Sequence, residues 1–418
     1  MITIKPFKAL RPRKDLASSI VSLPYDVVTD EEVREAVSKK ALSFLRIVRS
    51  EVDLESNIDS HSEEVYIKAK ENLEEYIKKG YMIQDEKPSL YVYRLIKGDY
   101  NQIGFVTAVS VADYDEDRIK KHEKTRIDKE DDRVKHIDVT NAHTGFVFLA
   151  YRAEEELGKI LTDIQNTTPE NDFFTEDNVR HTFWVINDEN ISDRVVNKFK
   201  TIEALYVADG HHRSAASSRV AKIRKGKNMS KSSDLESDYF LSIIYPDDCL
   251  NILPYNRAVR DINGKTIDEF KSKIESNFVV EKVNANDDKD GGYKPQEPKN
   301  IGMYLGGDWY LLKPKHCIID SDPVQGLDVS ILQNYLLEPI LGIKDPRTDK
   351  RIDFIGGVRG SGFLKKIVDS GEFAVSFSMY PTSITELMAV ADAKKLMPPK
   401  STWFEPKPRS GFAVHLLD

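Results

Sequence analysis

The chain has 418 residues, a length that predicts two or three domains rather than one hydrophobic core. Its 40% hydrophobic and 31% charged content is ordinary for a globular protein, and its net charge of −8 argues against a general nucleic-acid-binding surface. A local basic groove is compatible with that charge. No apolar stretch reaches the length of a membrane span, and the first residues lack the apolar segment of a secretory signal. We therefore expect a cytoplasmic protein with neither a membrane nor a nucleic acid as partner.

The chain has two cysteines, Cys249 and Cys317, which lie far apart and outside any CxxC spacing. Neither a disulfide framework nor a cysteine-ligated zinc site is expected from them. The sequence leaves open whether the chain forms a homo-oligomer.

Residues 1–88 are predicted to form an N-terminal helical or α+β region. Thr29-Asp30-Glu31-Glu32 has the pattern of a capping box and predicts a helix through about Lys39. A longer amphipathic helix is expected at His61–Lys79, and Gly80 ends it.

Residues 89–262 are predicted to form a central core of strands and helices. A dense charged stretch, Asp113–Asp138, interrupts the strand pattern. The predicted strands are Leu90–Ile96, Ile103–Ala112, Thr144–Tyr151, His181–Ile186, Ala204–Ala208 and Tyr239–Tyr245, with helices at Glu154–Gln165 and Ile191–Phe199.

Residues 263–418 are predicted to form a C-terminal α/β region, with a polar surface loop at Asn284–Pro298. The mixture of hairpins and helices along the chain indicates an α+β or mixed α/β fold, not one doubly wound sheet. The predicted elements of this region are helices at Thr266–Ser276, Asp328–Leu341, Gly362–Ser370 and Ser383–Ala391, and strands at Ile301–Leu305, Trp309–Lys313, Asp353–Ile355 and Phe373–Phe377.

The segment Glu203–Arg219 carries the strongest functional signal. An apolar run ends at Asp209-Gly210, and His211, His212 and Arg213 follow directly, before a run of small residues. This order predicts a strand, a glycine turn and a helix whose first turn carries three potential cations. The free N–H groups and the positive dipole end of such a helix favour an anion, so we interpret the segment as a phosphate site.

A structural interpretation of the same residues stays open. Asp-Gly is a common turn after a strand, Asp209 has the right chemistry to cap the helix, and a histidine there can be a hydrogen-bonded structural residue.

A second cluster lies at Lys120-Lys121-His122-Glu123-Lys124-Thr125-Arg126. By itself it resembles a solvated charged loop. If the fold brings it to the phosphate site, its cations can neutralise phosphate charge, and Glu123 can take a proton from a hydroxyl nucleophile. His122-Glu123 is not followed by the HExxH spacing of helical zinc proteases.

Three further segments leave alternatives open. His143 precedes a strand and is more typical of a turn than of a ligand, although His122, His143, His211 and His212 could converge on a metal. The glycine-rich turn after Asp353–Ile355 matches neither a Rossmann nor a Walker motif, and it is either structural or phosphate-binding. Trp403 and Phe404, near the end, either pin the tail to the core or wall a pocket.

The whole chain resembles a bacterial and archaeal family catalogued as domain of unknown function 1015. The resemblance rests on motifs in family order along nearly the full length: Pro24-Tyr25-Asp26-Val27, His122-Glu123-Lys124-Thr125, Ala208–Arg213, Asp353-Phe354-Ile355-Gly356-Gly357 and Met397–Phe404.

Asp209-Gly210-His211-His212-Arg213 is also similar to the phosphate motif of the ParB/sulfiredoxin superfamily. That superfamily includes nucleotide-dependent kinases of free L-serine, so the resemblance implies a ParB/sulfiredoxin-like central core with additional α/β regions at both ends. It also implies transfer of a phosphoryl group from ATP or ADP, with Mg²⁺, to the hydroxyl of serine or of a similar small compound.

On this interpretation the candidate residues have separate roles. Gly210, His211, His212, Arg213 and Ser214 would hold the nucleotide phosphates, and Asp209 would hold Mg²⁺ or orient the nucleophile. Glu123 is the candidate base, with Lys124 or Arg126 stabilising the transferred charge. His122, Thr125 and His143 are candidate substrate contacts.

Two other functions remain as alternatives. A nucleotide-binding regulatory protein akin to the partition proteins would bind nucleotide with little turnover. A metal-dependent hydrolase would use the histidines as ligands.

Overall fold

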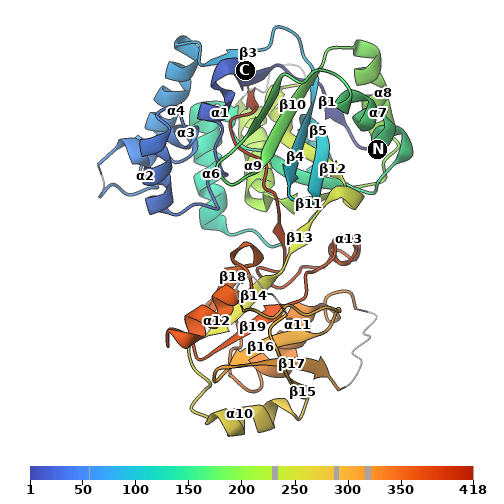
Figure 1. Ribbon diagram of the computed structural model, residues 1–418. Helices are drawn as coiled ribbons and strands as arrows, with labels where there is room; N and C mark the ends of the chain where they lie inside the picture. The colour runs from blue at the N-terminus through green and yellow to red at the C-terminus, as the bar shows by residue number, and fades with distance from the viewer. Residues whose placement is uncertain (56, 228–233, 287–290, 316–321, 418) are drawn as a thin grey trace. The chain divides into compact units, whose positions relative to one another are not determined.

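The computed structural model describes residues 1–55, 57–227, 234–286, 291–315 and 322–417, so Cys317 and residues 287–290 of the expected polar loop lie outside the described residues. The chain forms two compact units (Figure 1). The first unit holds Met1–Leu250 together with the C-terminal segment from Pro406, and the second unit holds Asn251–Glu405. In sequence, the second unit is therefore an insertion in the first. The division into regions 1–88, 89–262 and 263–418 stays a prediction.

The larger sheet of the first unit is mixed, which confirms the expected mixed α/β class. Its strand order is β6-β11-β8-β12-β5-β4-β10-β9, with β1 also paired to β5. The pairs β11–β6 and β8–β12 are parallel, and the other pairs are antiparallel. The strands are β1 (Ile4–Lys5), β4 (Leu90–Lys97), β5 (Tyr100–Ser110), β6 (Ile119–Lys120), β8 (Val147–Tyr151), β9 (Asn171–Phe174), β10 (Arg180–Ile186), β11 (Leu205–Asp209) and β12 (Tyr239–Pro246).

A smaller sheet in the same unit has the order β3-β2-β21-β7. It joins β2 (Ala9–Pro12), β3 (Met82–Gln84), β7 (Ala142–His143) and β21 (Val414–Leu416). Because β21 pairs with both β2 and β7, the end of the chain is an integral strand of this unit.

Helices pack against the larger sheet, and the helices of the N-terminal part of the chain lie beside it (Figure 1). Apolar side chains of α7 and α8 share one core with β4, β5, β8, β11 and β12, while α6 packs along α9. The helices are α1 (Ala17–Ile20), α2 (Asp30–Lys39), α3 (Leu45–Val48), α4 (Glu63–Lys78), α5 (Val111–Asp115), α6 (Ile127–Thr140), α7 (Glu155–Gln165), α8 (Glu189–Phe199) and α9 (His211–Lys227).

The second unit is built on an antiparallel sheet of order β15-β17-β16-β19-β14-β18, and β13 pairs separately with β20. Its strands are β13 (Ile252–Leu253), β14 (Tyr255–Val259), β15 (Phe278–Val283), β16 (Ile301–Leu305), β17 (Asp308–Pro314), β18 (Ile352–Gly356), β19 (Val375–Met379) and β20 (Trp403–Phe404). Its helices are α10 (Ile267–Ile274), α11 (Asp328–Leu332), α12 (Gly362–Asp369) and α13 (Ile384–Asp392).

Most of the longer predicted elements are present, with shifts of a few residues at their ends. The capping box at Thr29 is confirmed, because its hydroxyl accepts from the Glu32 N–H at 3.3 Å and its own N–H donates to the Glu32 carboxylate at 2.8 Å. The predicted helix at Asp328–Leu341 is instead a short α-helix followed by a π-helical segment, Gln333–Leu337. The strand expected at Phe373–Phe377 is present as β19, which begins and ends two residues later in the sequence.

None of the helices in the described parts of the chain has the length and apolarity that a membrane crossing requires.

Candidate functional site

The predicted strand, glycine turn and helix are β11, Gly210 and α9. The pairing of β11 with β8 changes register between Val207 and Asp209, which sets the end of the strand apart from the regular ladder. Gly210 follows with φ +93°, a conformation that residues with a Cβ rarely adopt. The N–H of Ser214 donates to the Gly210 carbonyl at 3.0 Å, which closes the first turn of α9.

The first turn of α9 presents backbone N–H donors that need an acceptor outside the helix. The N–H groups of His211, His212 and Arg213 precede the first i→i−4 bond, so the helix itself supplies them no acceptor. Gly210 stands at the capping position and has no side chain to accept from them. Donors of this kind, at the positive end of a long helix, suit an oxyanion.

Two cations meet at the Asp209 carboxylate. The Lys407 ammonium lies 2.7 Å from one oxygen, and the Arg213 guanidinium lies 3.7 Å from the other. Both cationic side chains are nearly buried, at 11% and 13% exposure. Burial raises the pKa of the Asp209 carboxyl, but the charges of Lys407 and Arg213 outweigh that effect and hold this pKa well below its usual range. Asp209 is therefore ionised at any physiological pH.

Arg213 is folded back against the turn that precedes it. Its guanidinium donates to the Phe146 carbonyl and, at 3.3 Å, to the Asp26 carboxylate. A Cβ at Gly210 would lie 3.2 Å from the Arg213 guanidinium carbon, so a larger residue would have to displace the guanidinium by a few tenths of an ångström. The charges of Asp26 and Asp209 outweigh the effect of burial and raise the pKa of Arg213.

The remaining predicted phosphate residues direct their side chains elsewhere. His211 is buried with its ring against His122. The His212 Nε2 accepts from the backbone N–H of Arg126 at 3.2 Å, and burial lowers the pKa of His212, so it is neutral there. The Ser214 hydroxyl donates to the His211 carbonyl at 3.0 Å. Their backbone N–H groups remain as donors for a phosphate.

The charged cluster at Lys120–Arg126 does reach the start of α9. His122 is buried, and its ring meets that of His211 edge to face with centroids 4.5 Å apart. Glu123 is exposed, yet His122, Glu123 and His211 can each offer a ligand atom within 4.8 Å of the other two.

The other members of this cluster lie outside the buried part of the site. Lys124 and Arg126 are exposed, and Arg126 pairs with Asp128 at 2.7 Å. The Thr125 hydroxyl donates to the Glu130 carboxylate, which is a local bond at the start of α6.

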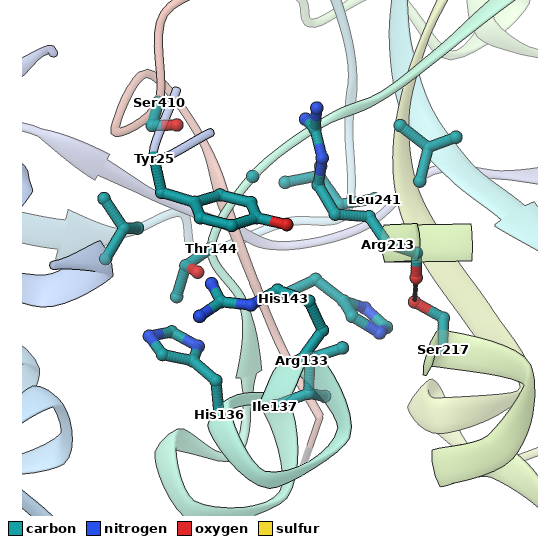
Figure 2. Close-up of a pocket in the computed structure, with 13 residues that line it drawn as sticks. Tyr25, Arg133, His136, Ile137, His143, Thr144, Arg213, Ser217, Leu241 and Ser410 are labelled. Carbon is teal, nitrogen blue, oxygen red and sulfur yellow. Dashed lines mark hydrogen bonds between the residues drawn. The ribbon is translucent and has the colours of Figure 1, made fainter. Parts of the chain in front are cut away.

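His143 is buried and lies beside His415. Its Nδ1 is 3.4 Å from the Nδ1 of His415, and its Nε2 is buried without a partner. His143 and Arg213 line a cavity of about 30 Å³, together with Tyr25, Arg133 and other residues (Figure 2). This volume has room for a water molecule or two, so the cavity is too small for a nucleotide.

The Pro24–Val27 motif lies at the same cavity, which Tyr25 lines. The Arg133 guanidinium carbon stands 4.0 Å from the centre of the Tyr25 ring. Burial raises the pKa of Tyr25 to about 12, so its hydroxyl stays protonated. Asp26, the next residue, is the carboxylate that contacts Arg213.

Sequence reasoning did not single out Lys407 or assign a site role to Tyr25 and Asp26. Lys407 comes from the C-terminal segment and carries no motif that marks it. The Pro-Tyr-Asp-Val pattern was visible as a family motif, but its contact with Arg213 depends on tertiary structure.

The glycine-rich segment after Asp353 belongs to the second unit. Asp353, Phe354 and Gly356 line a cavity of about 410 Å³, and Trp403 forms part of its wall. A Cβ at Gly356 would lie 2.7 Å from the Trp403 ring, so close packing alone accounts for this glycine. Trp403 thus lines this cavity and also packs against Tyr255 and Gly356, while Phe404 is buried in the paired strand β20, so both roles named for these residues are present.

The chain belongs to the family described as protein of unknown function DUF1015, whose model matches residues 4–330. The expected family membership is thereby confirmed. No curated protein matches the chain.

Several solved structures are similar in fold. A single-site mutant of a free serine kinase in complex with AMP is 11% identical, with 72% of this chain and 87% of that chain covered and a TM-score of 0.33. SbnI with a C-terminal truncation, from Staphylococcus aureus, is 13% identical, with coverages of 74% and 87% and a TM-score of 0.39. A conserved hypothetical protein from Pyrococcus furiosus is also 13% identical, with coverages of 74% and 95% and a TM-score of 0.33. Likenesses of this size carry no argument about the activity of this chain.

Proposed function

We propose that this protein is a nucleotide-dependent phosphotransferase that phosphorylates free L-serine, or a similar small hydroxyl compound, to O-phosphoserine. The observation that carries the proposal is the convergence of Lys407, Arg213 and the first three backbone N–H groups of α9 on the Asp209-Gly210 turn. Phosphoryl transfer depends mainly on charge stabilisation and alignment, and these groups are suited to both. The choice of serine follows from the motif's resemblance to free-serine kinases and not from the geometry.

In this proposal the backbone N–H groups of His211, His212 and Arg213 hold the phosphates of ATP or ADP. Lys407 and Arg213 add positive charge, and an incoming phosphate competes with the carboxylates of Asp209 and Asp26 for them. The helix dipole contributes in the same direction. In this proposal the nucleotide lies at the start of α9.

The transfer step needs one proton acceptor. The acceptor hydroxyl oxygen forms a bond to the terminal phosphorus while the bond from that phosphorus to the leaving nucleotide breaks, and the nucleotide keeps the electron pair. The hydroxyl proton passes to the carboxylate of Glu123, which is exposed and close to His211. Lys124 and Arg126, both exposed, are candidates to stabilise the charge of the moving phosphoryl group.

The expected Mg²⁺ role of Asp209 stays a prediction, and the surroundings weigh against it. Both carboxylate oxygens face cations, Lys407 and Arg213, which repel a third positive charge. The alternative role, orienting the cations and the nucleophile, fits better. We therefore expect Mg²⁺, where it is required, to accompany the nucleotide. A nucleotide and a free amino acid as substrates agree with the cytoplasmic location expected from the sequence.

The direct test is turnover. The full chain is incubated with ATP or ADP, Mg²⁺ and a panel of free amino acids and small hydroxyl compounds, and phosphorylated products are identified by mass spectrometry. We expect O-phosphoserine, or the phosphate ester of one panel member, to accumulate with time and enzyme concentration. If nucleotide binds but no product forms from any panel member, the regulatory alternative replaces the kinase.

A further inference from the structure

Two buried histidines and one carboxylate form a cluster beside the start of α9. His122 and His211 are only 2% and 5% exposed, and Glu123 lies next to them at the surface. One ligand atom from each residue lies within 4.8 Å of the other two. The three residues come from two separate segments that the fold brings together.

Each of the two histidines has a ring nitrogen without a partner. The Nδ1 of His122 and the Nε2 of His211 are buried and make no hydrogen bond. A buried polar atom without a partner costs free energy, and such atoms in folded proteins are commonly explained by a bound water or ion. Two of them in adjacent rings suggest one ligand that serves both.

The geometry of the two rings suits a metal ion. The rings meet edge to face and make no hydrogen bond to each other. Two imidazole nitrogens on one tetrahedral ion stand about 3.4 Å apart, which the spread of the cluster accommodates.

The surroundings of His122 also resemble those of a metal ligand. The His122 side chain makes a hydrogen bond to the backbone at Val207, which helps to hold the ring in place.

We propose that His122, His211 and Glu123 bind one divalent first-row transition-metal ion, with Zn²⁺ and Co²⁺ as suitable probes. Two imidazole nitrogens and one carboxylate oxygen are typical ligands of such ions, whereas Mg²⁺ prefers oxygen ligands alone. The site is separate from the Mg²⁺ that would accompany a nucleotide. Three protein ligands leave a coordination position for water or a substrate oxygen.

The inference does not depend on the phosphotransferase proposal. Glu123 has a part in both, so loss of turnover in a Glu123 variant does not distinguish them. Metal binding is therefore measured directly, without nucleotide and without a kinase assay.

The experiment uses the full chain, stripped with a chelator and returned to buffer. Co²⁺ is titrated while its visible absorption is followed, and Zn²⁺ is titrated by calorimetry. We expect one ion per chain and the stronger absorption that Co²⁺ shows when protein ligands replace water. Glu123→Gln, His122→Gln and His211→Gln should each weaken binding by about tenfold or more, because even residues behind the ligands contribute that much.

His181→Gln is the matched control, because His181 is equally buried but belongs to a different cluster around Tyr93. It should bind metal as tightly as the unsubstituted chain. Glu123→Gln changes an exposed residue, so it tests the site even if a histidine variant fails to fold. The proposal is overturned if the unsubstituted chain binds neither ion stoichiometrically, or if Glu123→Gln binds both unchanged.

Discussion

At the scale of single residues, Asp209 is the carboxylate on which two nearly buried cations depend. Lys407 and Arg213 both face it, and Arg213 also contacts the carboxylate of Asp26. Removing one partner of such a group leaves charge without compensation, which costs more than an exposed ion pair contributes.

Asp209→Asn should therefore reduce both stability and turnover. We expect the free energy of unfolding to fall by about 3 kcal/mol, measured by urea denaturation, because Lys407 and Arg213 lose their shared counter-charge. Asp172→Asn is the matched control, since Asp172 pairs with Arg180 at 2.6 Å in a more exposed setting. It should cost less than about 1 kcal/mol. Equal losses in the two variants would contradict the description of Asp209.

His136 gives a residue-scale prediction about pH. Burial lowers the pKa of His136 to about 4, and its Nε2–H donates to the Ile47 carbonyl at 3.0 Å. Because the pKa is depressed in the folded state, the unfolded chain binds the extra proton between about pH 6.5 and pH 4. The contribution to stability is thus full above about pH 6.5 and is lost as the pH falls towards 4.

His136→Gln should make stability less dependent on pH in that window. The slope of unfolding free energy against pH should decrease by up to about 1.4 kcal/mol per pH unit, the value for one proton. Urea denaturation of both proteins at several pH values between about 4.5 and 7 measures this slope. An unchanged slope would contradict the conclusion that His136 is buried in its neutral form.

At the scale of elements, the junction of β11 and α9 depends on one glycine. Gly210→Ala would strain a backbone at φ +93° and bring a methyl group within 3.2 Å of the Arg213 guanidinium. We expect a loss of about 1–3 kcal/mol in stability and weaker nucleotide binding, since the first-turn N–H groups would be displaced.

Gly226→Ala, near the other end of α9, is the control for this change. A Cβ there would meet nothing within 4 Å, so this substitution should leave nucleotide binding unchanged and add up to about 1 kcal/mol of helix stability. Calorimetric titration with ADP compares the two variants. If Gly210→Ala binds ADP as tightly as the unsubstituted chain, the turn is not part of the nucleotide site.

The same junction shows how far the sequence could predict the structure. The β11-Gly210-α9 unit follows from local rules, namely an apolar run, a glycine that permits positive φ and a run of small residues. The sequence does not predict the helix α6, because Asp113–Asp138 is dominated by charged residues. The buried face of α6 also includes polar side chains, those of Asp132, Arg133 and His136, so it shows no apolar stripe. The approach of the Lys120–Arg126 cluster to the phosphate site was expected only conditionally, because it depends on tertiary structure, and the ring contact of His122 with His211 was not predicted.

At the scale of the whole molecule, the C-terminal segment is a structural part of the first unit. It supplies the strand β21 and the site residue Lys407, and it inserts Phe412 into an aromatic cluster. The Phe412 ring stacks on Phe183 at 5.4 Å and on Phe173 at 5.7 Å. No local sequence pattern predicts that the C-terminal segment belongs to the first unit, because the whole second unit separates the two in the sequence.

Phe412→Ala should therefore destabilise the first unit by about 3–5 kcal/mol, as the loss of a fully buried ring does. Phe174→Ala is the control, because Phe174 neighbours the same cluster in sequence but is 67% exposed. It should change stability by no more than about 0.5 kcal/mol. A small effect of Phe412→Ala in denaturation experiments would show that the tail is not part of the core.

The central claim is that the Asp209–Arg213 turn binds phosphate, and a crystal structure of the full chain with ADP tests it most directly. We expect the terminal phosphate of ADP within hydrogen-bond distance of the backbone N–H groups of His211, His212 and Arg213, with Lys407 nearby. Clear density for ADP elsewhere, with these N–H groups bonded to other parts of the chain, would contradict the account.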